Sequence, residues 1–205
     1  MNYNQWLDDE YQIWIDGLKE LAEAGNLEAA SQLPMVMVPE RFAQDFGGTG
    51  NATQRRYKYY ANKIAMRLSR MRRSDILEIG GGYGAFCKAF YSVAGELINS
   101  YHILDLPQVM DIQRAYLAGT PRLFFGDPHK IDFLISCYCL GELKTETKAR
   151  YIHEYVARAT HGFVIWNPAF APDPDGIALI RSYHPGLVVT DEYPKTAPFN
   201  LQLSW

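Results

Sequence analysis

The stretch "DILEIGGGYGAF", residues 75–86, places four glycines within five positions directly after an apolar run. That run has the composition of a buried strand, and the residues after the glycines have helical spacing. A glycine-rich turn between a strand and its helix lets the backbone approach a ligand closely and points free N–H groups at it. We therefore predict a ligand-binding turn formed by Gly80, Gly81, Gly82 and Tyr83.

Short apolar runs alternate with helical patterns from residue 74 onward. This alternation predicts parallel strands joined by helical crossovers, with helices on both faces of the sheet. The last two runs are joined only by "PKTAP", which is too short for a crossover helix, so we expect them to pair as an antiparallel hairpin. The fold class is therefore α/β, a doubly wound, mostly parallel sheet of seven strands with an antiparallel C-terminal strand. The expected strands are residues 75–79, 101–106, 122–125, 131–137, 162–166, 187–193 and 199–205.

The chain of 205 residues is long enough for one sizeable core, so we interpret residues 1–205 as a single domain. Residues 1–73 form a helical cap or lid, and residues 74–205 form the α/β core. Eight Lys or Arg lie between residues 55 and 73 with no acidic residue among them. They form a solvated face, a face that docks on the acidic N-terminal helix, or a lid in which Arg55 and Tyr59 close over cofactor and acceptor.

Overall charge and apolar patterning restrict the location and partners of the protein. The net charge of −3 argues against wholesale binding to nucleic acid or membranes. There is no run of about 18 apolar residues and no signal-peptide pattern at the start, so we expect a cytoplasmic protein. The three cysteines form no CxxC pair and are odd in number, which indicates packing and not a disulfide framework or zinc site. Cys137 and Cys139 share one face if their run is a strand.

Two acidic residues suggest what the glycine turn binds. Asp105, 23 residues beyond Gly82, ends the second strand, where a carboxylate can accept both hydroxyls of a ribose or cap the following helix. Glu78 lies two residues before the first glycine. A carboxylate there suits the ammonium of S-adenosylmethionine and would repel the pyrophosphate of a dinucleotide. These positions favour S-adenosylmethionine as cofactor.

Five stretches carry a resemblance to a known family: "LEIGGGYG", "YHILDLPQV", "QRAYL", "GD" after the third strand, and "DFLISCYCLGEL". Together they resemble class I S-adenosylmethionine-dependent methyltransferases, and most closely a group of sugar O-methyltransferases, over roughly residues 50–166. The resemblance implies that Gly80 and Gly82 pass the methionine moiety and that Asp105 holds the ribose. It also implies that Asp127 binds near the adenine amino group and that Leu106 forms one side of the adenine slot.

The methyl acceptor should lie beyond the carboxyl ends of the central strands. Glu142 is the preferred base or hydroxyl-orienting group, because a sugar hydroxyl must lose its proton to attack a methyl group. Tyr138 lines the cofactor side. Capping of the next helix is the other interpretation of Glu142, and His129 is a rival base. His161 should lie at the remote end of its strand.

Two residues at the end of the fifth strand are candidates for binding the acceptor. The indole of Trp166 could pack on a sugar ring, and the amide of Asn167 could bridge two hydroxyls. A rim aromatic that covers the sheet end is an equal interpretation of Trp166. Asp173 and Asp175 could hold a divalent ion, but such a proline-rich loop is more often only a turn, so our main interpretation includes no metal.

The sequence therefore predicts an S-adenosylmethionine-dependent O-methyltransferase that acts on a sugar of a glycan or of an activated precursor, with deoxyhexoses such as rhamnose as candidates. An RNA or small-molecule methyltransferase is one alternative, although "CYCL" stands where the NPPY-type tetrapeptide of an RNA methyltransferase would be. A dehydrogenase is another, with Tyr59 and Lys63 at Tyr-x-x-x-Lys spacing but before the glycine turn. The last is a non-catalytic module of a larger glycan-assembling polypeptide.

Overall fold

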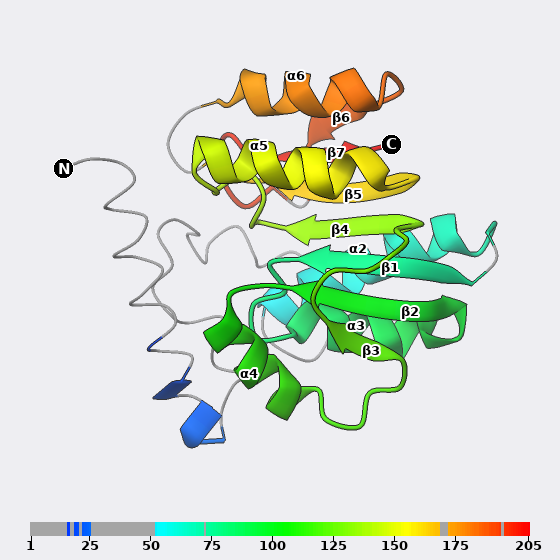
Figure 1. The fold of residues 1–205 in the computed structure, drawn as a ribbon, viewed down its shortest axis with the longest axis vertical. Coiled ribbons are helices and arrows are strands. Elements are labelled where there is room, and N and C mark those ends of the chain that lie inside the picture. The colour runs from blue at the N-terminus through cyan, green and yellow to red at the C-terminus, as the bar shows by residue number, and fades with distance from the viewer. Residues whose placement is uncertain are drawn as a thin grey trace.

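A seven-stranded sheet of order β3-β2-β1-β4-β5-β7-β6 forms the centre of the computed structural model (Figure 1). The structure describes residues 16, 19, 20, 22–25, 52–71, 73–168, 172–193 and 195–205. The N-terminal acidic helix and the glycine segment at residues 47–51 therefore lie largely or wholly outside the described residues.

The strands and helices alternate as the sequence indicates. The strands are β1 (Ser74–Ile79), β2 (Ile98–Leu104), β3 (Leu123–Phe125), β4 (Phe133–Cys137), β5 (His161–Trp166), β6 (Val188–Asp191) and β7 (Leu201–Ser204). The α-helices are α2 (Ala52–Leu68), α3 (Ala85–Ala94), α4 (Pro107–Tyr116), α5 (Thr145–Glu154) and α6 (Pro174–Tyr183), with short 3-10 helices η3 (Gly95–Leu97) and η4 (Val156–Arg158).

Strand pairing confirms the predicted fold class. Strands β1 to β5 pair in parallel, whereas β7 is antiparallel to both β5 and β6. Strand β2 begins three residues earlier than expected, at Ile98, which is followed by the polar residues Asn99 and Ser100. The side chains of Asn99 and Ser100 each donate a hydrogen bond of 2.7 Å to Asp75 at the start of β1, and these bonds satisfy the polar start of the strand.

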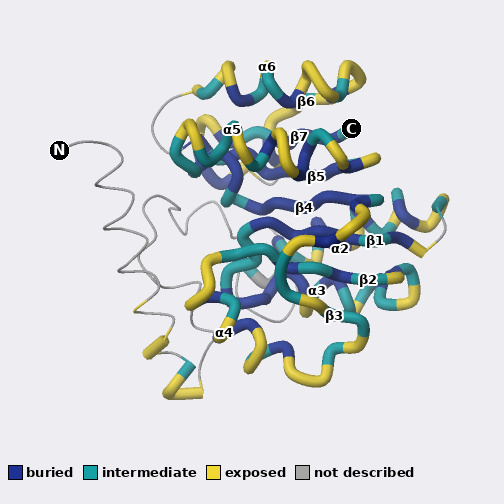
Figure 2. Tube along the Cα trace, in the orientation of Figure 1, coloured by how far each residue is buried: buried dark blue, intermediate teal, exposed yellow. Residues whose placement is uncertain are grey.

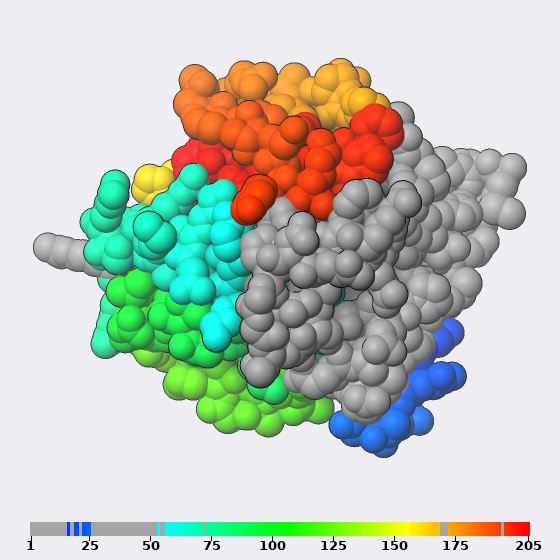
Figure 3. All heavy atoms as spheres, turned by 180° about the vertical axis from the view of Figure 1, so that it is seen from behind, coloured from blue at the N-terminus to red at the C-terminus, as the bar shows by residue number. Residues whose placement is uncertain are grey.

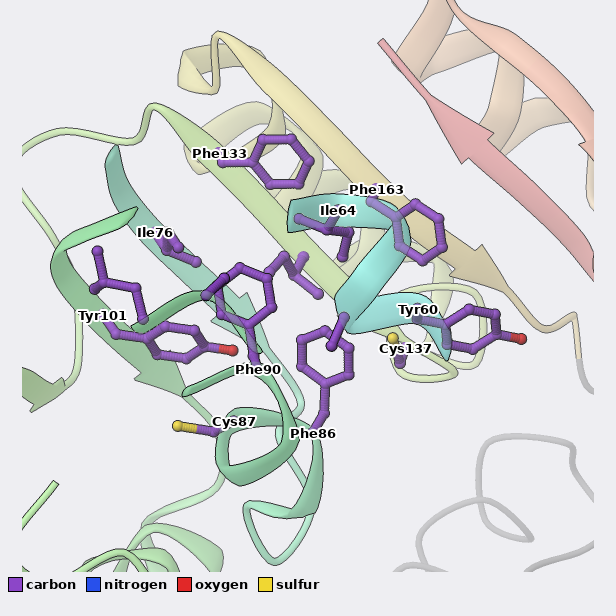
Figure 4. Packing of buried hydrophobic residues seen from close by; sticks show 14 of the residues in the cluster. Tyr60, Ile64, Ile76, Phe86, Cys87, Phe90, Tyr101, Phe133, Cys137 and Phe163 are labelled. Atoms are coloured by element: carbon purple, nitrogen blue, oxygen red, sulfur yellow. The ribbon is translucent and has the colours of Figure 1, made fainter. Parts of the chain in front are cut away.

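The sheet divides the core into two layers of buried side chains (Figure 2). One layer joins α2 and α3 to the sheet, and Figure 4 shows Ile64, Phe86 and Phe90 packed within it. The other layer joins α5, η4 and α6 to the opposite face through Ile152 and Ile180. Alternate residues of each central strand enter different layers, so both faces of these strands are apolar.

The prediction that Cys137 and Cys139 share one face is wrong. Strand β4 ends at Cys137, and Tyr138 then adopts a positive φ of 69°, which breaks the alternation. Cys137 consequently packs in the α2 and α3 layer, and Cys139 packs against the α5 and α6 layer. No helix in the described part of the chain is long and apolar enough to cross a membrane.

Candidate active site

The glycine turn connects β1 to α3 at the carboxyl edge of the sheet. Gly80, Gly82 and Gly84 have φ values of 72°, 56° and 97°, which L-residues with side chains rarely adopt. The Gly80 N–H donates a 2.9 Å hydrogen bond to the Leu104 carbonyl, so the turn is attached to the end of β2. A Cβ on Gly80 would lie only 2.1 Å from the Cβ of Cys139, and the turn therefore packs directly on the segment after β4.

The Glu78 carboxylate lies buried beside this turn. Its Oε2 accepts a 2.8 Å hydrogen bond from the Tyr101 hydroxyl. A Cβ on Gly81 would lie 3.4 Å from the Glu78 Cδ. Burial, opposed by the Tyr101 hydrogen bond and assisted by the charge of Asp105, raises the pKa of Glu78 to about 8. The site thus contains a carboxyl group that a nearby cation would help to ionise.

Asp105 lies just beyond β2 and faces the same turn. Its Oδ1 accepts a 2.8 Å hydrogen bond from the Leu106 N–H. Burial raises the pKa of Asp105 to about 6, and hydrogen bonds from Leu106, Gln113 and the glycine backbone moderate the shift. Leu106, not Asp105, is the N-cap residue of α4. The capping interpretation of Asp105 is therefore wrong, and its carboxylate remains at the carboxyl edge.

Gln113 is a site residue that the sequence interpretation missed. Its side-chain amide donates to the Gly82 carbonyl at 2.6 Å and to Asp105 Oδ2 at 2.9 Å, so it joins the turn to the acid. Gln113 is fully buried, on the same face of α4 as Val109 and Ile112. A polar residue within an apolar helical stripe was the signal that could have identified it, since buried amides need partners.

The other predicted cofactor residues lie in different environments. Leu106 is 46% exposed at the end of β2, which leaves its side chain open to a ligand. Asp127, after β3, is exposed and forms a 3.5 Å ion pair with Arg158. The Tyr83 side chain is buried, with its ring edge-on to Tyr116 at 5.2 Å, so Tyr83 packs the turn against α4.

Glu142 and Asn167 meet beyond the carboxyl ends of β4 and β5. The Asn167 amide donates a hydrogen bond to Glu142 Oε1. The two segments are in close contact, because a Cβ on Gly141 would lie 2.7 Å from the Asn167 backbone nitrogen. Burial raises the pKa of Glu142 to about 8, and the Asn167 hydrogen bond opposes the increase. The N-cap of α5 is Lys144, so the structure does not support the capping interpretation of Glu142.

Tyr138 belongs to a buried polar cluster that also includes Arg56, Tyr60 and Glu192. Glu192 Oε1 accepts hydrogen bonds from Tyr138 and, at 2.8 Å, from Tyr60 of α2. The Arg56 guanidinium lies 5.1 Å from the centre of the Tyr138 ring. The cluster connects α2 and the loop after β6 to the end of β4. The sequence interpretation did not include Arg56 or Glu192, which come together only through the tertiary structure.

Two predicted acceptor-site roles are wrong. Trp166 is fully buried, and a Cβ on Gly176 of α6 would lie 2.6 Å from its ring, so its indole cannot pack on a sugar. His129 is exposed in the loop after β3 and does not join Glu142. Its neighbour Lys130 pairs with Asp132 and with Asp75 at the start of β1, so this part of the loop lies toward the amino ends of the strands.

The remaining candidates are structural or lie elsewhere. His161 begins β5 at the amino edge, as expected. Asp173 caps α6 by accepting from the Gly176 N–H at 3.1 Å, and it also pairs with Lys148. Among the described residues no group of three or more His, Cys, Asp or Glu is arranged to hold a metal.

The predicted contributions of α2 to the site are only partly visible. The Tyr59 ring contacts Tyr193 edge-on at 5.9 Å, next to the cluster of Glu192. The Arg55 side chain lies outside the described residues. Lys63 donates a 2.6 Å hydrogen bond to Gln202 of β7, so the Tyr59 and Lys63 pair does not face the glycine turn as a dehydrogenase would need.

Comparison with solved structures identifies this architecture. A protein from Nostoc punctiforme PCC 73102, provisionally assigned as an O-methyltransferase, matches 75% of this chain and 57% of its own with a TM-score of 0.50 and 13% identity. The fold is the Rossmann-like fold of methyltransferases.

Two further solved structures are similar to this chain at low sequence identity. An S-adenosylmethionine-dependent methyltransferase from Aquifex aeolicus matches 70% of this chain and 87% of its own, with a TM-score of 0.48 and 15% identity. Magnesium protoporphyrin IX methyltransferase from Synechocystis PCC 6803, solved with bound S-adenosylmethionine, matches 80% and 88%, with a TM-score of 0.49 and 14% identity. No family model and no curated protein matches the chain.

Proposed function

We propose that this protein is an S-adenosylmethionine-dependent O-methyltransferase that acts on a sugar hydroxyl, with Glu142 as the general base. One contact supports the proposal most strongly. The glycine turn packs on Cys139 at Gly80, and the Glu142 N–H donates a 2.9 Å hydrogen bond to the Cys139 carbonyl. The candidate base is therefore one tight turn away from the residue that contacts the candidate cofactor turn.

The residues around the turn fit S-adenosylmethionine. A Cβ on Gly81 would lie 3.0 Å from Ile103 and 3.3 Å from the Gln113 amide nitrogen, so a side chain at this position would require both neighbours to shift. The two carboxyl groups, Glu78 and Asp105, have pKa values raised mainly by burial. An ammonium near Glu78 and ribose hydroxyls at Asp105 would compensate this cost, whereas a pyrophosphate would increase it.

The proposed chemistry assigns separate tasks to the two sides of the site. Bound S-adenosylmethionine supplies an activated methyl group. Glu142 accepts the proton of the acceptor hydroxyl as the oxygen attacks, and a pKa of about 8 gives it more basicity than an ordinary carboxylate. Asn167 holds Glu142 in place through the hydrogen bond to Oε1. Reaction rate depends strongly on this placement, because an alcohol is a poor nucleophile unless oriented and deprotonated.

The sugar acceptor rests on the resemblance described above and on chemistry that suits a hydroxyl. In this proposal the acceptor is one sugar of a glycan or of an activated precursor, with deoxyhexoses such as rhamnose as first candidates. The domain acts in the cytoplasm, alone or as part of a larger glycan-assembling polypeptide. The lid role of Arg55 and Tyr59 belongs to the same proposal.

Calorimetry and a transfer assay test the proposal in two stages. The first compares S-adenosylmethionine, S-adenosylhomocysteine and NAD, and we expect the first two to bind and NAD not to bind. Binding of NAD alone would overturn the cofactor assignment. The second follows transfer of a labelled methyl group to a panel of free sugars, glycosides and nucleotide sugars, with a short RNA as comparison. Transfer to the RNA and not to sugars would overturn the acceptor assignment.

A further inference from the structure

A groove of about 620 Å³ opens at the opposite, amino edge of the sheet, away from the glycine turn. It lies between α2 and the β6 and β7 strands, and its wall includes His161 at the start of β5. Figure 3 shows α2 (cyan) at the surface on this side, near the orange and red C-terminal hairpin. The volume lies within the usual range of small-molecule sites.

Three cations line one wall of the groove. Lys63 and Arg67 are spaced at i and i+4 on α2, so they share one face of the helix, and Arg70 lies in the turn directly after the helix ends at Leu68. Of the described residues that line the groove, none is acidic. In the described part of the chain, these three residues form no salt bridge. Within the part of the chain that the structure describes, no ion pair therefore neutralises the positive charge of the groove.

Neutral side chains hold two of these cations in place. Lys63 donates to Gln202 at 2.6 Å, and Arg67 donates to Ser204 at 3.1 Å. Burial and the neighbouring Arg67 lower the pKa of Lys63. Like charges held together in this way disfavour the empty groove and would be relieved by a bound anion.

The rest of the groove is apolar. Met66 and Val188, which are 72% and 55% exposed, flank it. The rings of its Phe and Trp residues offer little surface to a nucleobase, because Phe133 is buried and Trp205 is stacked on His184 at 4.7 Å. Exposed methionine adapts well to flexible aliphatic chains. The apolar half is therefore better suited to an aliphatic group than to a nucleotide base.

We propose that this groove binds a phosphate-bearing aliphatic amphiphile, with the phosphate on Lys63, Arg67 and Arg70 and the chain on Met66 and Val188. The site is separate from the methyl-transfer site and does not depend on the proposed function. It would tether the protein to a ligand that combines an anionic head with an aliphatic tail.

Calorimetry at low ionic strength tests the site with four probes: decyl phosphate below its micelle concentration, inorganic phosphate, decyl maltoside and uridine diphosphate. We expect saturable binding of decyl phosphate, at least about ten times tighter than that of the other probes, since head and chain each contribute. Equal or tighter binding of decyl maltoside would show that charge plays no part. Equal or tighter binding of inorganic phosphate or uridine diphosphate would overturn the aliphatic assignment.

Two double variants, one for the charged half of the groove and one for the apolar half, test the halves separately, and a third double variant is the control. The double variant Lys63→Gln/Arg67→Gln should lose at least about tenfold in decyl phosphate affinity. The control Arg150→Gln/Arg181→Gln removes the same charge from exposed positions on α5 and α6 and should bind as the wild type does. Met66→Ser/Val188→Ser changes only exposed residues and should weaken decyl phosphate binding while leaving inorganic phosphate binding unchanged.

Failure of the groove proposal can be distinguished from failure of the proposed function. S-adenosylhomocysteine should bind all these variants equally, because the groove lies away from the glycine turn. Absence of S-adenosylhomocysteine binding with intact decyl phosphate binding would refute only the methyltransferase proposal. The groove proposal would be refuted if the control variant lost affinity for decyl phosphate, or if Lys63→Gln/Arg67→Gln kept wild-type affinity for it.

Discussion

The side-chain amide of Asn167 donates a hydrogen bond to Glu142 across the carboxyl ends of β4 and β5. Neither residue is on a strand, and they are 25 positions apart in the sequence. Their contact gives a buried carboxyl group a defined orientation and a neutral partner. A group that is buried, oriented and raised in pKa has the properties of a general base.

Glu142→Gln should reduce turnover by about 10²- to 10⁴-fold, because the amide keeps the shape of the side chain but cannot accept a proton. S-adenosylhomocysteine affinity should remain that of the wild type. Steady-state kinetics and calorimetry measure the two effects. Glu146→Gln, an exposed change in the first turn of α5, serves as control and should leave both unchanged. Near-normal turnover of Glu142→Gln would assign the proton transfer to another group.

The same substitution should change how stability depends on pH. The pKa of Glu142 is raised from 4.5 to about 8 by burial, so the folded protein retains a proton that the unfolded chain releases between these values. Wild-type stability should therefore fall as pH rises from about 4.5 to about 8, by roughly 1.4 kcal/mol for each pKa unit as an upper limit. Urea denaturation at pH 5 and pH 8.5 should show that the free energy of unfolding falls less between these pH values in Glu142→Gln than in the wild type. Parallel curves for the two proteins would show that Glu142 is ionised in the folded state.

Asn167→Ala should move the ascending limb of the pH–activity profile to higher pH. The Asn167 amide lowers the pKa of Glu142 against the effect of burial, so its removal raises that pKa further. Turnover measured from pH 6 to pH 10 tests the shift. A profile that falls in amplitude without moving would mean that Asn167 orients the acceptor and does not tune Glu142.

Cofactor binding should be linked to the protonation of Glu78. Its pKa of about 8 leaves the carboxyl mostly protonated at neutral pH, and a cationic ligand would favour the ionised form. S-adenosylmethionine should therefore bind more tightly as pH rises from 6 to 9 and should release a fraction of a proton at pH 7. Calorimetry in buffers with different ionisation enthalpies detects this proton. Glu78→Gln should bind without proton release, and an identical release in that variant would exclude Glu78 as its source.

Gln113→Ala should weaken S-adenosylhomocysteine binding by about tenfold or more. The change removes the hydrogen bonds to Gly82 and Asp105, so the turn and the proposed ribose acid lose their connection. Gln108→Ala, an exposed change on the same helix, is the matched control. Equal affinities of the two variants by calorimetry would show that the Gln113 contact only stabilises the fold.

Glu192→Ala should lower the free energy of unfolding by at least about 2 kcal/mol. It leaves buried donors of Tyr60, Tyr138, Thr196 and Asn200 without their acceptor. Asp191→Ala, a neighbouring exposed change, should cost much less because its pair with Lys195 is on the surface. Chemical denaturation measures the free energy of unfolding of both variants. Similar losses would indicate that solvent satisfies the groups that donate to Glu192.

The sequence by itself determined the sheet and the edge at which the proposed cofactor residues lie. Strand periodicity, the glycine cluster and short connections are local signals, and local geometry restricts how they can fold. The antiparallel hairpin followed from a five-residue link, and Glu78 and Asp105 followed from their spacing to the turn. The carboxyl ends of neighbouring parallel strands must share one edge, so these residues could be grouped without a structure.

Only the tertiary structure decided which side chains face that edge and which are buried. Trp166 ends a strand as Asn167 begins a loop, yet packing of Gly176 on the indole buries the former while the latter meets Glu142. Gln113, Arg56 and Glu192 enter their clusters from distant segments. The loop that carries His129 runs toward the opposite edge, where Lys130 pairs with Asp75. These outcomes depend on packing and charge pairing between segments far apart in the chain, and no local pattern encodes such contacts.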